Sequence, residues 1–132
     1  MTYLTDTHSL IWSVLQPGKL SRKVREILEN PAYTISVSAV NFWKISLKYS
    51  IGKLELKGIL PQEFPQIVLQ MGFLSIPLTP VEAVSYHNLN GNRHKDPFDK
   101  MLIWQAMRHD FTFIRKDKNV MKYEENGLKV VW

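Results

Sequence analysis

The alternation of strand-like and helix-like segments is the feature of this sequence that most constrains its fold. Short runs rich in apolar or β-branched residues, typical of strands, end at Asp6 and span 32–38, 73–78, 111–117 and 128–132. Segments typical of helices lie between the first four runs, at 9–15, 20–31, 38–54, 62–72, 79–89 and 96–110. Parallel strands need long crossover connections, which are usually helices. We therefore expect an α/β fold, a three-layer α/β/α domain with a central, mostly parallel sheet flanked by helices.

Several helix ends carry their own local signals. Ser21 precedes one helix as an N-cap. Thr79, Pro80 and Glu82 predict a capping box with proline at the first helical position. Gly72 is expected to end the helix at 62–72.

Composition restricts the classes of protein to which the chain can belong. Its 132 residues, 45% of them hydrophobic, suit one domain spanning 1–132. No apolar run approaches the roughly 20 residues of a membrane-spanning helix, and the N-terminus lacks an export signal, so we expect a cytoplasmic protein with no membrane partner. The lack of cysteine excludes disulfides and thiolate chemistry. A net charge of +5 favours nucleic acid as a partner, although a solvated basic surface explains it equally well.

Three aspartates are expected at one edge of the sheet. Asp6 and Asp117 follow strands, and Asp99 lies in the first turn of a helix. Carboxylates gathered at the carboxyl ends of parallel strands are suitable ligands for Mg²⁺ or Mn²⁺. Each acid also has a structural explanation: Asp6 as a helix cap, Asp96 and Asp99 as a capping box, and Asp117 as a turn residue.

Lys44 is a charged residue inside a predicted apolar helix face. On a helical projection it falls near the centre of that face, which consists of Val40, Trp43, Leu47 and Ile51. His94, close to the acids in sequence, is a candidate neighbour of a substrate or metal. For the tryptophans on apolar helix faces we expect core packing; these are Trp12, Trp43 and Trp104.

Taken together, these residues resemble the VapC-type PIN domains, the toxin ribonucleases of bacterial toxin–antitoxin pairs. The specific matches are "DTH" with the following "LIW" at 6–12 and "DPFDKMLIWQA" at 96–106. Supporting matches are "SVSAVNFWKISLKYSIGKL" at 36–54, "FLSIPLTPVEA" at 73–83 and "FIRKDKNVMKY" at 113–123. The matches follow the family order and cover nearly the whole chain.

The resemblance implies a PIN-like domain with an acidic pocket that binds Mg²⁺ or Mn²⁺ and cuts RNA. The metal ligands implied are Asp6, Asp99 and Asp117, with Asp96 a weaker candidate because it fits a capping role. The implied partners are a cognate antitoxin that blocks the site and an RNA substrate, and we expect a homodimer.

Lys44 is the main departure from the family pattern. The family has a glutamate in the helix after the second strand, where this chain has "WKISLK". A second departure places Arg115 or Lys116 where a small hydroxyl residue is usual. One interpretation is that Lys44 pairs with Asp6 or Asp99 and weakens or abolishes metal binding and cleavage. The other is that Lys44 extends to solvent, so that three aspartates remain able to hold one ion.

Two functions therefore remain open from the sequence. The first is a divalent-metal-dependent endoribonuclease, the toxin of a VapBC-type pair, impaired in this copy by Lys44. The second is a non-catalytic PIN-fold protein that binds antitoxin or RNA without cleaving it.

Overall fold

A five-stranded sheet forms the centre of the protein, in a computed structural model that describes residues 1–89, 96–116, 121–124 and 127–132. Its strands lie in the order β3-β2-β1-β4-β5, and every neighbouring pair is parallel. The strands are β1 (Thr2–Thr5), β2 (Thr34–Ser38), β3 (Leu74–Ile76), β4 (Thr112–Ile114) and β5 (Lys129–Val131). The register aligns Leu4 of β1 with Ser36 of β2 and with Phe113 of β4. The parallel sheet predicted from the alternating segments is confirmed.

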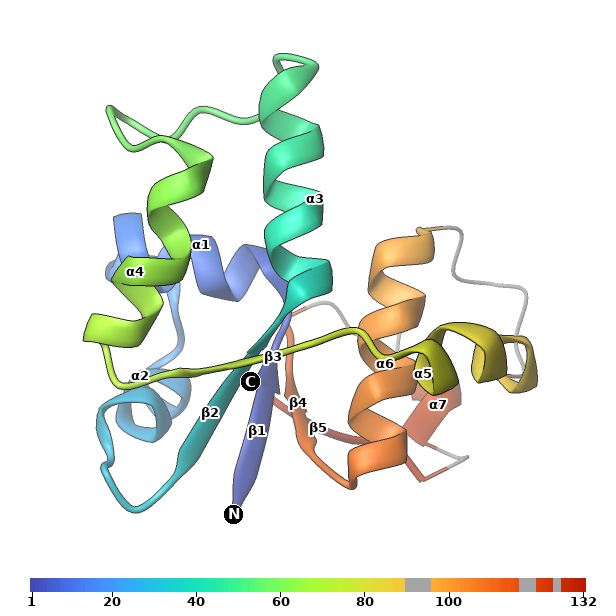
Figure 1. The fold of residues 1–132 in the computed structure, drawn as a ribbon. Coiled ribbons are helices and arrows are strands. Elements are labelled where there is room, and N and C mark those ends of the chain that lie inside the picture. Colours follow the sequence, from blue (N-terminus) through green and yellow to red (C-terminus); the bar gives the residue numbers. More distant parts are fainter. Residues whose placement is uncertain (90–95, 117–120, 125–126) are drawn as a thin grey trace.

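Helices cover both faces of this sheet (Figure 1). The α-helices are α1 (Thr7–Leu15), α2 (Arg22–Glu29), α3 (Ala39–Ser50), α4 (Phe64–Gln70), α5 (Pro80–Ser85), α6 (Pro97–His109) and α7 (Met121–Glu124). Short 3₁₀ turns are η1 (Pro17–Lys19), η2 (Pro61–Glu63) and η3 (Tyr86–Asn88). Figure 1 shows α1, α2 and α4 on one side of the sheet and α5, α6 and α7 on the other. The three-layer α/β/α arrangement is thus as predicted.

Two apolar cores lie on opposite faces of the sheet, because successive strand residues point to opposite sides. Tyr3 and Ile114 belong to the core that packs under α1, α2 and α4. Leu4 and Phe113, their neighbours in the chain, belong to the core under α6.

Helix capping follows the local sequence closely. The Ser21 hydroxyl accepts a hydrogen bond from the backbone N–H of Val24 at 3.1 Å. The Thr79 hydroxyl accepts from the Glu82 N–H at 3.2 Å, and the Glu82 carboxylate accepts from the Thr79 N–H at 2.9 Å. The predicted cap and capping box are both confirmed. Gly72 follows α4 with φ of 84°, a conformation that glycine adopts without strain, so it ends this helix as expected.

Helix α3 is oriented differently from the sequence prediction. Lys44 is only 5% exposed, whereas Trp43 is 61% and Ile51 54% exposed. The side of α3 that faces the protein carries Val40, Asn41, Lys44 and Ile45. The prediction that Trp43 packs in the core is therefore wrong. The physical reason is that the buried side of this helix makes polar contacts with neighbouring elements, so hydrophobic periodicity does not define it.

None of the described helices is both long enough and apolar enough to cross a membrane.

Candidate active site

A pocket of about 790 Å³ opens where the carboxyl ends of the central strands meet helices α1, α3 and α6. This is the edge at which open parallel sheets usually bind ligands. Among the described residues, the acids that line it are Asp6, Asp96 and Asp99. The basic residues in the lining are Lys44, Lys48, Lys53, Arg115 and Lys116. The described part of the lining is therefore rich in charge of both signs.

Asp6 lies directly after β1 and caps α1. Its Oδ1 accepts a hydrogen bond from the Ser9 N–H at 2.8 Å, which satisfies one of the unpaired donors at the start of a helix. Its own N–H donates to the Ile114 carbonyl at 3.1 Å, so β4 places Asp6 beside the residue that follows Ile114. Burial raises the pKa of Asp6 above its ordinary value, against the opposing effects of the Ser9 hydrogen bonds and the charge of Arg115.

Asn41 connects the start of α3 to the same corner. Its Oδ1 accepts from the Ser38 N–H at 2.8 Å, and its Nδ2 donates to the Thr5 carbonyl at 3.2 Å and to the Thr7 hydroxyl at 3.1 Å. These bonds hold α3 against the end of β1. Lys44, one turn after Val40, is thereby directed into the pocket.

The Lys44 ammonium bridges two carboxylates of α6. Nζ lies 2.7 Å from Asp96 Oδ2 and 3.2 Å from Asp99 Oδ1. The expected pairing of Lys44 with Asp99 is therefore present, while Asp96 is an additional partner that the sequence did not indicate. A lysine that extends to solvent, the other interpretation, is not observed, because Lys44 is buried.

Arg115 contacts Asp99 from the opposite side. Its NH1 lies 3.1 Å from Asp99 Oδ2, and its guanidinium, at the end of β4, is also buried. Asp99 thus receives a cation on each carboxylate oxygen. We call the cluster of Lys44, Asp96, Asp99 and Arg115 the cation clamp. In the sequence, Arg115 comes directly after a strand whose carboxyl end lies at the site. That position is the signal that could have identified Arg115 as a partner of Asp99.

Asp96 keeps the capping role that the sequence predicted. Its Oδ1 accepts from the backbone N–H groups of Phe98 at 2.9 Å and Asp99 at 3.4 Å. The other oxygen contacts Lys44. One carboxylate therefore both starts α6 and contributes to the cation clamp.

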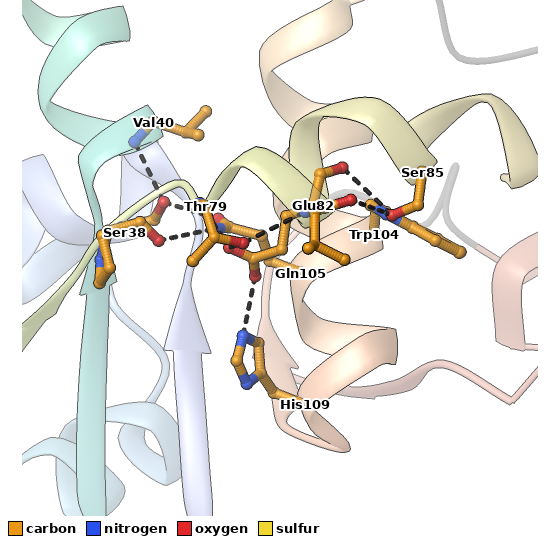
Figure 2. A network of polar contacts seen from close by, with 10 residues as sticks. Ser38, Val40, Thr79, Glu82, Ser85, Trp104, Gln105 and His109 are labelled. Atoms are coloured by element: carbon orange, nitrogen blue, oxygen red, sulfur yellow. Dashed lines mark hydrogen bonds and ion pairs between the residues drawn. The ribbon is translucent and has the colours of Figure 1, made fainter.

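A buried polar network joins α6 to the last residue of β2 and to the residue that follows β3 (Figure 2). Gln105 of α6 accepts from the Ser38 hydroxyl at 2.6 Å and donates to the Pro77 carbonyl at 3.2 Å and to Glu82 at 3.4 Å. Glu82 also contacts His109 Nε2 at 2.8 Å. Burial alone would raise the pKa of Glu82, but its hydrogen bonds from Thr79, His109 and Gln105 outweigh that effect and lower it. Because Ser38 immediately precedes α3, the network holds together the two helices that carry Lys44 and Asp99 of the cation clamp.

The described side chains do not fit a divalent cation. Both oxygens of Asp99 face cations, Asp96 divides its oxygens between a helix cap and Lys44, and one oxygen of Asp6 accepts from a backbone N–H. Among the described residues no group of three or more aspartate, glutamate, histidine or cysteine side chains is arranged to hold a metal. Magnesium needs a nearly octahedral set of free oxygens, which this cluster lacks.

Two of the predicted site residues lie outside the described part of the chain. Asp117, the third metal ligand implied by the resemblance, is one, and His94 is the other. The roles assigned to them stay predictions.

Comparison with known proteins identifies the fold. The VapBC2 complex of Rickettsia felis bound to a DNA fragment from its promoter matches with a TM-score of 0.65 and 16% identity, covering 99% of this chain and 98% of the other. FitAcB of Neisseria gonorrhoeae matches with a TM-score of 0.65 and 21% identity, covering 98% and 96%. A PilT N-terminus domain protein of Sulfolobus solfataricus matches with a TM-score of 0.56 and 15% identity, covering 99% and 86%. No protein-family model matches the sequence, and the curated proteins include no significant match. The chain therefore has the PIN-domain (PilT N-terminus) fold, as the motifs predicted.

Proposed function

We propose that this protein is a VapC-like toxin-type PIN protein that binds RNA and whose divalent-metal-dependent ribonuclease activity is impaired by Lys44. The cation clamp is the observation that supports this proposal: the ammonium lies between Asp96 and Asp99, where the family resemblance places carboxylates and a metal ion. A divalent ion about 5 Å from this ammonium would be repelled by roughly 2 kcal/mol in water-like surroundings, and by more in a less polar pocket. Even the smaller value corresponds to more than a tenfold loss of affinity.

The expected protein partner is an antitoxin. Several of the solved structures with this fold are VapBC or FitAB complexes, which supports the same kind of pairing for this chain. The basic residues around the pocket would hold the phosphate backbone of RNA.

We also expect two copies of the chain to associate through the exposed side of α3. Trp43 packs edge-on against Phe98 at 4.8 Å between ring centroids, yet it leaves most of its surface to solvent. An apolar pocket of about 160 Å³ lies beside them, lined by both rings and by Val40, Leu78 and Met101. Exposed aromatic anchors next to apolar hollows are typical of protein interfaces.

The decisive test measures cleavage of a labelled RNA with Mg²⁺, with Mn²⁺ and with EDTA. We expect little or no metal-dependent cleavage by the wild type and clear metal-dependent cleavage by Lys44→Glu, because that change removes the cation and supplies the missing acid. Lys23→Glu makes the same change of charge on α2, outside the pocket lining, and should not restore cleavage. The double variant Lys44→Glu/Asp6→Asn should lose the restored activity, which would exclude a contaminating nuclease.

Two results would contradict the proposal. If the wild type cleaves RNA with Mg²⁺ as fast as Lys44→Glu, Lys44 does not impair the site. If folded Lys44→Glu remains inactive with both metals, the loss of activity has another cause and the role given to Lys44 is wrong.

A further inference from the structure

The acidic and basic side chains that line the pocket differ in their exposure to solvent. Asp6 and Asp99 lie at the base, 5% and 8% exposed. Lys53 and Lys116 are exposed, and Lys48 is partly exposed. The exposed part of the described lining is therefore mainly cationic, and Asp96, whose side chain is 33% exposed, is its accessible carboxylate.

Two of the three acids in the described lining, Asp96 and Asp99, are paired with cations within the protein. Lys44 and Arg115 face Asp99, and Lys44 faces Asp96. Five basic and three acidic side chains line the described part of the pocket, a formal excess of positive charge. That excess would persist with Asp117 added to the count. A metal ion would thus add positive charge to a site that is already positive, whereas an anion would reduce the repulsion among its lysines.

The pocket also offers room and aromatic surface beside these cations. Its volume of about 790 Å³ is within the range of small-ligand sites, roughly 300–1,000 Å³. The Trp12 ring lies in the lining, with the His8 ring 5.9 Å away and the Lys116 ammonium 5.9 Å from its centroid. Cations interleaved with aromatic rings are the usual surface for single-stranded nucleic acid.

We infer that this pocket binds phosphate groups of single-stranded RNA or of a nucleotide directly through its lysines, with no divalent ion bridging the phosphate to the protein. Lys48, Lys53 and Lys116 make the contacts, and the two cations of the cation clamp offset the charges of Asp96 and Asp99. The choice of RNA as the source rests on the proposed function, whereas the direct, metal-free binding rests on the arrangement of charges.

The test uses fluorescence anisotropy with a labelled 2′-O-methyl oligonucleotide, which cannot be cleaved through its 2′ oxygen. We expect the same Kd, within about twofold, in EDTA and in Mg²⁺ at matched ionic strength. The logarithm of the binding constant should fall linearly with the logarithm of salt concentration, by about 0.7 for each phosphate contacted. Lys48→Ala/Lys53→Ala should weaken binding at least about tenfold and, by removing two phosphate contacts, flatten that slope by about 1.4. Lys23→Ala on α2, outside the pocket lining, should leave both unchanged.

Competition identifies the source of the phosphate. Displacement of the probe by a mononucleotide or inorganic phosphate at millimolar concentration indicates a single-phosphate site, and displacement only by longer oligonucleotides indicates a backbone groove. Both outcomes agree with direct phosphate binding. Binding that requires Mg²⁺, or that falls equally in Lys23→Ala and the pocket variant, would overturn the inference.

Failure of this inference is separable from failure of the proposed function. If the wild type cleaves RNA with Mg²⁺ but binds the probe equally well in EDTA, only the proposed impairment of cleavage by Lys44 is contradicted. If the wild type does not cleave RNA and binds the probe only with Mg²⁺, only the inference of direct, metal-free phosphate binding is contradicted.

Discussion

Replacing Lys44 by methionine should destabilise the fold and at the same time create a response to metal. Methionine keeps most of the length and apolar contact of the lysine stem but removes the ammonium. Breaking one partner of a buried ion pair costs about 3–5 kcal/mol. The cost is smaller here because the Asp96 side chain is 33% exposed and Arg115 still faces Asp99, so we expect a loss of about 1–3 kcal/mol. At about 3–5 °C per kcal/mol for a chain of this size, Tm should fall by roughly 3–15 °C.

Magnesium should reverse much of this loss in the variant alone. Without the ammonium, Asp96 and Asp99 each have an oxygen without its Lys44 partner, and a cation can take its place. A ligand at about 100 times its Kd stabilises the folded state by about 2.7 kcal/mol. The wild type already holds its own cation between these carboxylates, so its Tm should change little when Mg²⁺ is added.

Thermal unfolding followed by circular dichroism, in EDTA and in a Mg²⁺ titration, measures both effects. Lys48→Met is the matched control, because it removes a lysine one turn further along α3 from the same pocket. Because Lys48 is partly exposed, Lys48→Met should lower the free energy of unfolding by no more than about 0.5 kcal/mol and should create no response to Mg²⁺. The reasoning is refuted if Lys44→Met is as stable as the wild type, or if Mg²⁺ stabilises both proteins equally.

Further predictions concern the neighbouring elements. Asp6→Ala should lower the unfolding free energy by about 1 kcal/mol in urea titrations through loss of the α1 cap, whereas Asp6→Asn should keep the cap. Gln105→Leu removes the acceptor of the Ser38 hydroxyl proton and a donor to the Pro77 carbonyl, while Glu82 keeps its bonds to Thr79 and His109, so the same titration should show a loss of about 2–4 kcal/mol; a loss below about 1 kcal/mol would mean that water replaces the amide. The pKa of Glu82 is lowered by folding, so its contribution to stability is complete above the ordinary glutamate pKa and declines as the pH falls through the lowered value; Glu82→Gln should flatten that acid limb. Light scattering should give the wild type about twice the protomer mass of 15.4 kDa, and Trp43→Ser should shift it towards one protomer; an unchanged mass would exclude α3 as the contact.

Much of the architecture could be predicted because the determining signals are local. The capping box at Thr79 and the cap at Ser21 depend on residues within one turn, and the parallel sheet follows from the order of strands and helices. The position of Asp6 in the pocket lining, at the carboxyl end of β1, followed from the same topology.

The cation clamp could be predicted only in part: the family resemblance suggested that Lys44 pairs with Asp6 or Asp99, whereas the contacts of Lys44 with Asp96 and of Arg115 with Asp99 were not foreseen. Lys44 meets Asp96 and Asp99 across 52 and 55 residues of chain, and no periodicity encodes such a pairing. The orientation of α3 was missed because hydrophobic spacing assumes that the apolar face is the buried one. Here the polar residues Asn41 and Lys44 are satisfied inside the protein and Trp43 is left outside.

The identity of the residue at the centre of the cation clamp has a genetic consequence. Codons for lysine and glutamate differ only in their first base, so a single A-to-G transition replaces the Lys44 ammonium by a carboxylate. The neighbouring helix cap at Asp96, the Arg115 contact and the buried network around Gln105 would all remain encoded as before. This one base change would, under our proposal, convert the impaired form of the pocket into one that binds a metal ion. Under our proposal, a population of cells that carries this gene would hold revertants at the spontaneous mutation rate, and sequencing codon 44 after growth with and without an antitoxin would reveal which form selection retains.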